Sequence, residues 1–222
     1  MATLVGFIAF IFSIVVHENA HGLAADYFGD PTARYSGRIT LNPLPHLDPM
    51  GSVVLPLVAF FGGGFLIGWA KPVPVNPANL RKPLVHNAYV AIAGPLSNLL
   101  LAIAGAILWI LVRVIFKHLD FLAIGGDKTL LFFGVLCDSL IKYNCILMVF
   151  NLLPIPPLDG HWILMRFLPP GPRAAFAAIG PYGFFILIAL VLTGVLGLII
   201  SFPLEFLYYN FRLLIETVVR FL

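Results

Sequence analysis

The stretch His17-Glu18-Asn19-Ala20-His21 reads H-E-x-x-H and lies near the end of an apolar run that begins at Thr3. No charged residue precedes it in that run, so three ionisable side chains appear together where the composition otherwise suits lipid. In a helix, residues four apart project from one face, so both imidazoles can bind one zinc ion. Glu18 would then lie beside a metal-activated water. The pattern predicts a metalloprotease whose active site lies inside the membrane, if another segment supplies a third ligand.

The composition indicates an integral membrane protein. Of the 222 residues, 60% are hydrophobic and only 10% are charged, whereas soluble domains carry about 25% charged residues. The apolar run starts without a basic region and ends in the polar cluster, so we do not expect a cleaved signal peptide. The net charge of +3 is too small to indicate a nucleic-acid partner. Cys137 and Cys145 lie in an apolar stretch and are expected to be unpaired.

The apolar runs predict an all-α polytopic membrane protein with a single peptidase domain over residues 1–222. A spanning helix needs about 20 largely apolar residues. Three spans, expected at about 3–27, 84–112 and 129–153, would form a three-helix catalytic core. A fourth span is expected at 174–200, and an interfacial amphipathic tail at 204–222 would complete a C-terminal helix pair. The alternative for this tail is a short fifth span.

Two further segments are expected to depart from spanning helices. Residues 51–70 are apolar but are interrupted by Pro56 and by Gly62-Gly63-Gly64, which favours a re-entrant segment. The alternative for this segment is a kinked spanning helix. Residues Arg34 to Leu41, just before Asn42-Pro43, have the pattern of a short strand and predict one arm of a β-hairpin.

The basic residues predict an orientation, because they concentrate on the cytoplasmic side of membrane proteins. One arrangement places all the basic clusters inside: Arg34, Arg38, Lys71, Arg81, Lys82, Arg166 and Arg173. It requires residues 51–70 to enter and return without crossing. If they crossed, the histidines and Asp159 would lie at opposite faces. We therefore expect a multi-pass protein of the cell (inner) membrane with its active site near the cytoplasmic side.

Asp159 is the best candidate for the third ligand. It follows the third expected span, at the same inner end as His17 and His21. The preceding prolines break the helix and allow the chain to turn toward the core. An unpaired carboxylate at that depth would cost several kcal/mol, which a metal partner would explain. The alternative is an ordinary turn or capping residue.

The other catalytic roles also have candidates. Glu18 would act as general base toward the water and would return the proton to the leaving amine. Asn98 and Asn151 could stabilise the oxyanion or hold the substrate backbone, although Asn98 could instead bond a neighbouring helix. The remaining histidines are expected to be structural: His46 (beside Asp48), His86, His118 and His161.

Three motifs together carry a family resemblance. H-E-x-x-H lies in the first core span, Ala93-Gly94-Pro95-Leu96-Ser97-Asn98 reads A-G-P-x-x-N in the next, and residues 151–160 read N-x-x-P-x-x-P-L-D-G. Over roughly residues 3–165 the chain resembles the site-2 protease family of intramembrane zinc metalloproteases. Residues 37–43 and 46–51 are similar to its compact bacterial branch, without PDZ or CBS domains. Unlike some relatives, the chain is expected to have no span before the H-E-x-x-H helix.

The resemblance implies that His17, His21 and Asp159 bind Zn²⁺, that Glu18 is the general base, and that transmembrane proteins or peptides are the substrates. Such substrates must be unwound, and the extended segments Arg34–Leu41 and Trp69–Pro77 could bind them by β-augmentation. The competing hypothesis is a non-catalytic metal-binding scaffold or carrier in the bilayer, which would have no use for Glu18. A transporter is disfavoured because no internal repeat is visible. The oligomeric state is left open.

Overall fold

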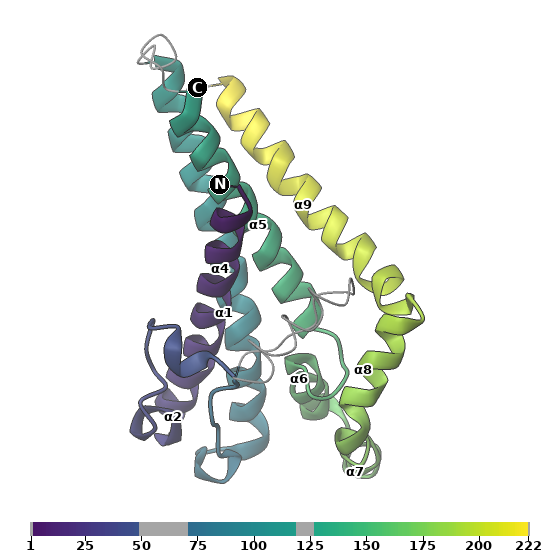
Figure 1. Ribbon diagram of the computed structural model, residues 1–222. Helices are drawn as coiled ribbons and strands as arrows, with labels where there is room; N and C mark the ends of the chain where they lie inside the picture. Colours follow the sequence, from purple (N-terminus) through teal and green to yellow (C-terminus); the bar gives the residue numbers. More distant parts are fainter. Residues whose placement is uncertain (1, 49–70, 119–126, 222) are drawn as a thin grey trace.

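The computed structural model describes residues 2–48, 71–118 and 127–221, and all regular elements in these ranges are helical (Figure 1). Five helical segments there are long and apolar enough to cross a membrane: Ala2–Tyr27, Pro83–Lys117, Asp127–Asn151, Pro170–Leu192 and Val195–Phe221. The described part of the chain is therefore all-helical and has the helices of a multi-pass membrane protein, as the composition predicts. The re-entrant segment predicted for residues 51–70 lies outside the described residues.

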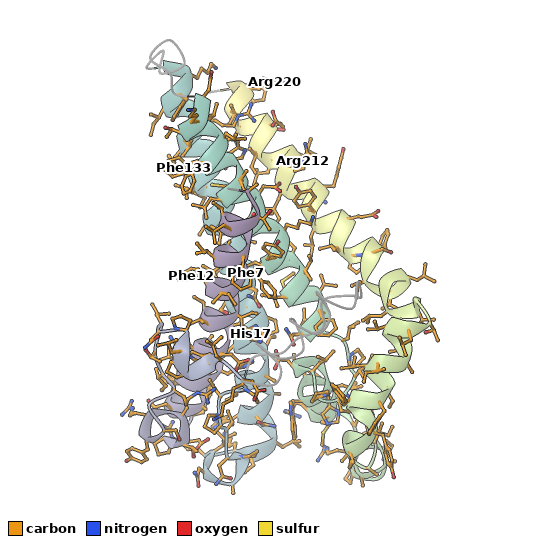
Figure 2. The ribbon with its side chains drawn as sticks, in the orientation of Figure 1. Phe7, Phe12, His17, Phe133, Arg212 and Arg220 are labelled. Carbon is orange, nitrogen blue, oxygen red and sulfur yellow. The ribbon has the colours of Figure 1, made fainter. Side chains whose placement is uncertain are left out.

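The helices α1 (Ala2–Tyr27), α4 (Pro83–His118) and α5 (Asp127–Asn151) pack together as the central bundle. Their buried faces carry small side chains, which let helix backbones approach closely in a membrane: Gly6, Ala9, Ser13, Ala102, Ala106, Cys137 and Cys145. Large apolar side chains point outward instead, such as Phe7 and Phe12 on α1 (Figure 2). A bundle with small residues inside and large apolar residues outside suits a lipid environment.

A tight return of the chain places α6 (Asp159–Phe167) against α4. The helix α5 ends at Asn151, and Pro154 follows three residues later. A Cβ atom at Gly160 would collide with the carbonyl oxygens of Leu152 and Leu153, so only glycine allows α6 to begin so close to the end of α5. This return brings Asp159, the first residue of α6, to the side of the central bundle.

The C-terminal part differs from the predicted boundaries. After α7 (Pro170–Ala177) and α8 (Gly183–Leu192), a turn at Thr193-Gly194 leads into α9 (Val195–Phe221). The expected end of the fourth span, at residue 200, therefore lies inside α9. In Figure 1, α9 crosses obliquely to the far ends of α4 and α5, where Ile215 and Val219 are buried against these helices. The tail is thus part of one long helix packed on the bundle.

The predicted β-hairpin is wrong. Residues 32–35 form the short helix α2 (Thr32–Tyr35), and no strand follows it within residues 2–48. Arg38 turns inward and donates from its Nη2 atom to the carbonyl oxygens of Lys71, at 2.6 Å, and Pro72, at 3.2 Å. The carbonyl oxygens of Lys71 and Pro72 therefore already accept hydrogen bonds from a side chain. Pro72 and Pro74 have no N–H group to donate, so this part of the chain offers residues 34–41 no ladder to pair with.

Residues 71–76, which we call the strap, have no regular secondary structure and lie beside the C-terminal half of α1, and Asn76 has an extended backbone. Asp30 holds their far end: its buried carboxylate accepts hydrogen bonds from the Asn76 amide at 2.6 Å and from the Asn79 side chain at 2.9 Å. Thr32 adds two further donors. Burial alone would raise the pKa of Asp30, but these hydrogen bonds outweigh burial and hold its pKa below the usual range.

The Asp30→Ala variant is expected to lose stability, because the Asn76 and Asn79 donors would lose their acceptor at about 1–3 kcal/mol each. This corresponds to a fall in melting temperature of about 5 °C or more for a chain of this size. The measurement is thermal unfolding in detergent. Asp26→Ala is the control, because among the described residues the Asp26 side chain pairs only with the exposed Arg34, an interaction worth about 0–1 kcal/mol. Equal melting temperatures for the two variants would contradict the anchoring role.

The contribution of Asp30 also has a defined pH dependence. The folded-state pKa lies below the unfolded value of about 3.9, so the stabilisation is fully present above about pH 4. It disappears as the pH falls through the lowered pKa. The difference in stability between the wild type and Asp30→Ala should therefore shrink below pH 4, and a difference that grows there would contradict this assignment.

Candidate metal centre and active site

His17, His21 and Asp159 meet at one point inside the bundle. The Nε2 atoms of the two histidines are 3.1 Å apart, and the two carboxylate oxygens of Asp159 lie 3.3 Å from one Nε2 atom each. Both histidines are buried and Asp159 is largely so. At 1.5 Å per residue, His17 lies about 15 Å from the end of α1 at Tyr27, well inside the helix (Figure 2). The structure thus brings together the three residues that the sequence nominates as ligands.

Both imidazole rings are held from behind through their Nδ1 atoms. His21 Nδ1 lies 2.7 Å from the carbonyl oxygen of Val90, and His17 Nδ1 lies 2.6 Å from Asn98 Oδ1. A backbone carbonyl can only accept, so the Nδ1 atom of His21 carries a proton, and in the neutral ring its Nε2 atom keeps a lone pair. Hydrogen bonds from Nδ1 to an oxygen are the usual way in which a protein orients a histidine that binds metal through Nε2.

The donor set fits a zinc ion. Two imidazole nitrogens and one carboxylate are the protein ligands of many catalytic zinc sites, which keep a further position open. The Oδ2 atom of Asp159 is buried and accepts no hydrogen bond from the described residues. Acceptor atoms that converge at about 3 Å without a donor repel one another, and a cation among them removes this repulsion. The three residues therefore have the chemistry of a metal centre.

Gly94 lines the same point from α4. A Cβ atom there would collide with His21 Nε2 and would lie 2.5 Å from His17 Cε1. Only glycine therefore leaves room for the two rings at this contact between α1 and α4. This requirement accounts for the glycine of the A-G-P-x-x-N motif, which the sequence alone marks only as part of a pattern.

Glu18 lies beside this cluster and is held by the strap. Its Oε2 atom accepts a hydrogen bond of 2.8 Å from the backbone N–H of Val73. Sequence reasoning singles out residues 69–77 as extended but gives no sign of this contact. The donor is a main-chain N–H group, which every residue type except proline has. The identity of residue 73 therefore does not reveal this contact in the sequence.

The two asparagines proposed for the oxyanion lie in different surroundings. Asn98 is fully buried behind His17, and its Nδ2 atom donates to Asn144 Oδ1 at 2.8 Å. Asn151 donates to the Leu147 carbonyl of its own helix at 2.9 Å. Their roles toward an oxyanion stay predictions. Asn144 is a residue that the sequence analysis missed.

The other described histidine rings have other neighbours. The His46 Nε2 atom lies 3.0 Å from the carbonyl oxygen of Thr40, and His86 stacks on Phe28. His161 packs on an aromatic ring of α7. Within the described residues, only His17, His21 and Asp159 form a cluster that could hold a metal ion.

The Gly94→Ala variant is expected to bind zinc at least about 100-fold more weakly, because the added methyl group displaces both imidazoles. The measurement is competition with a chelator of known affinity. Gly197→Ala is the control, since the added Cβ would meet no atom within 4 Å there, and its zinc affinity should equal that of the wild type. Wild-type affinity in Gly94→Ala would mean that the metal does not bind between these rings.

Comparison with known proteins identifies several relatives. The chain is 41% identical over 198 residues to "Putative zinc metalloprotease YwhC" of Bacillus subtilis, covering 89% of this chain and 84% of the relative. It is 32% identical over 188 residues to "Putative zinc metalloprotease Rip2" of Mycolicibacterium smegmatis, covering 84% of this chain and 66% of the relative. The Mycobacterium tuberculosis Rip2 is 29% identical over 185 residues.

No family model matches the sequence, and no solved structure matches it either. The match to YwhC nevertheless extends over most of both proteins. The chain therefore belongs to the family of YwhC and Rip2, whose members carry the name "putative zinc metalloprotease".

Proposed function

We propose that this chain is a zinc metalloprotease of the site-2 type, which hydrolyses peptide bonds within or near the transmembrane segments of other membrane proteins. The observation that carries the proposal is the buried cluster of His17, His21 and Asp159, with Glu18 beside it, inside helices that are long and apolar enough to span a membrane. The names of the relatives support the protease activity and the use of zinc.

His17, His21 and Asp159 would hold the metal ion. When bound in such a site, zinc acts as a Lewis acid that polarises a carbonyl group and makes water nucleophilic near neutral pH. The protein contributes the orientation: the Val90 carbonyl and Asn98 fix the two rings from behind. The packing of α6 against α4 brings the carboxylate of Asp159 to the two imidazole rings.

Glu18 would act as the general base. The hydrogen bond from Val73 holds its Oε2 atom, which leaves Oε1 to take the proton of the attacking water. The same oxygen would then return the proton to the leaving amine. A carboxylate held at one oxygen loses less conformational freedom in the reaction than one that must first be ordered.

The location of the site argues for a membrane-embedded substrate. The ligands lie in the interior of a bundle whose outer faces are apolar, so the scissile bond must be brought to that depth. A substrate helix would have to be unwound, and the strap offers an extended backbone for pairing. The N–H of Val75 makes no hydrogen bond to the described residues. Residues 34–41 include the end of α2 followed by turns and bends, so they offer less extended backbone for this role.

The orientation rests on the distribution of basic residues. Seven of the 13 lysines and arginines lie in or beside α2, the strap, α6 and α7, toward the lower end of the molecule in Figure 1. The other six lie on α4, α5 and α9, among them Arg212 and Arg220 in the upper part of Figure 2. By the positive-inside rule the lower end would face the cytoplasm, in the cell (inner) membrane. The metal cluster belongs to the same half of the bundle.

The Glu18→Gln variant should keep zinc and lose cleavage of a co-expressed transmembrane substrate by about 10²–10⁴-fold, since only the general base is removed. Substrates can be identified by comparing the membrane proteomes of cells with the wild type and the variant. Glu205→Gln, an exposed glutamate of α9, is the matched control and should cleave normally. Full cleavage by Glu18→Gln would refute this mechanism, and zinc binding without any cleavage by the wild type would favour the non-catalytic scaffold.

The Val73→Pro variant tests the contact between the strap and Glu18. Proline retains the extended backbone but lacks the N–H group, so the carboxylate loses a charge-assisted hydrogen bond worth about 1.5–3 kcal/mol. We expect cleavage to fall by about 10–100-fold, with zinc content unchanged. Val73→Ala keeps the N–H and should cleave nearly as well as the wild type. Wild-type cleavage by Val73→Pro would show that this hydrogen bond does not position Glu18.

A further inference from the structure

A row of buried polar side chains extends from His17 into the apolar interior. Asn98 of α4 donates from Nδ2 to Asn144 Oδ1 of α5 at 2.8 Å, and Asn144 donates from Nδ2 to Ser13 Oγ of α1 at 2.8 Å. We call Ser13, Asn144 and Asn98 the buried relay. All three side chains are completely inaccessible. The relay crosses all three helices of the central bundle and ends at the Nδ1 atom of His17, 2.6 Å from Asn98 Oδ1.

The end of the relay that is farthest from His17 determines which atom donates in each of its hydrogen bonds. Ser13 Oγ donates to the Ala9 carbonyl at 2.7 Å, and the second N–H of Asn144 donates to the Leu140 carbonyl at 2.8 Å. Backbone carbonyls can only accept. The hydroxyl proton of Ser13 is therefore used, so Ser13 accepts from Asn144. Both N–H groups of Asn144 are then used, and its oxygen faces Asn98.

The same reasoning determines the state of the metal ligand. Because Asn144 presents an oxygen, Asn98 must turn its NH₂ group toward it, and Asn98 presents its own oxygen to His17. An oxygen acceptor requires that His17 Nδ1 carry the proton. The Nε2 atom then keeps its lone pair toward His21 and Asp159. The opposite orientation of the amides would place a proton on Nε2 and block a metal ion.

We propose that Asn144 and Ser13 are positioning residues, which act through Asn98 to select the tautomer of His17 that can bind metal. The inference that a metal is bound rests on the proposed function. The tautomer of the metal-free ring does not, because the relay is complete without any ion. Polar groups between membrane helices can also serve only to hold the helices together. If these polar groups only held the helices together, their hydrogen bonds could run in either direction, and the tautomer of His17 would not depend on them.

The test measures the tautomer and the metal affinity separately. Nitrogen-15 spectra of the metal-free protein, labelled at histidine and assigned with a His17→Asn variant, report which ring nitrogen carries the proton. Chelator competition reports the affinity for Zn²⁺. Asn144→Leu removes the middle of the relay, and Ser13→Ala is a milder variant that tests the relay if Asn144→Leu does not fold. Asn210→Leu is the matched control, since Asn210 also donates to the carbonyl four residues earlier but lies on the exposed side of α9.

The wild type and Asn210→Leu should show His17 protonated at Nδ1. Asn144→Leu should show a mixture of tautomers and bind zinc about 10–100-fold more weakly, and Ser13→Ala should show a smaller change in the same direction. The proposal is overturned if metal-free wild-type His17 is protonated at Nε2, or if Ser13→Ala and a folded Asn144→Leu change only the melting temperature. If the wild type binds no zinc, the proposed function fails, while the spectra still decide the relay.

Discussion

The convergence of three acceptor atoms inside a lipid-facing bundle is the constraint to which the rest of the structure conforms. Two Nε2 atoms and a carboxylate lie about 3 Å apart, and the Oδ2 atom of that carboxylate accepts no hydrogen bond from the described residues. In a low dielectric, such an arrangement is costly unless a cation compensates it. The residues around it serve to bring these atoms together and to keep other groups away.

Several features become intelligible from this constraint. Gly94 gives the rings the room that any side chain would fill, and Gly160 lets α6 begin close enough to the end of α5 for Asp159 to reach them. The Val90 carbonyl and Asn98 fix the rings from the opposite side. Two other sets of buried polar groups are paired: Asp30 accepts from the strap and from Thr32, and the relay is hydrogen-bonded across three helices.

Much of the fold and of the site is predictable from the sequence. The apolar runs predict the central helices, because a bilayer imposes a minimum length of apolar residues on each span. The sequence nominates Asp159 because an unpaired carboxylate at the inner end of a span would be costly, and the structure places it beside the two histidines. The hairpin prediction at residues 34–41 failed because a strand needs a partner backbone. The available partner contains prolines, and its carbonyls are occupied by Arg38.

By itself the sequence determined the local chemistry: the pair of histidines on one helix face, with Glu18 beside them, follows from the helical repeat alone. Only the tertiary structure decided what meets this pair. The contacts of Val73 with Glu18, of Asn144 with Asn98, and of Gly94 with the rings join segments far apart in the chain. Such contacts depend on how closely the helices pack and on main-chain groups that every residue type shares. A periodic pattern of side chains carries no information about either.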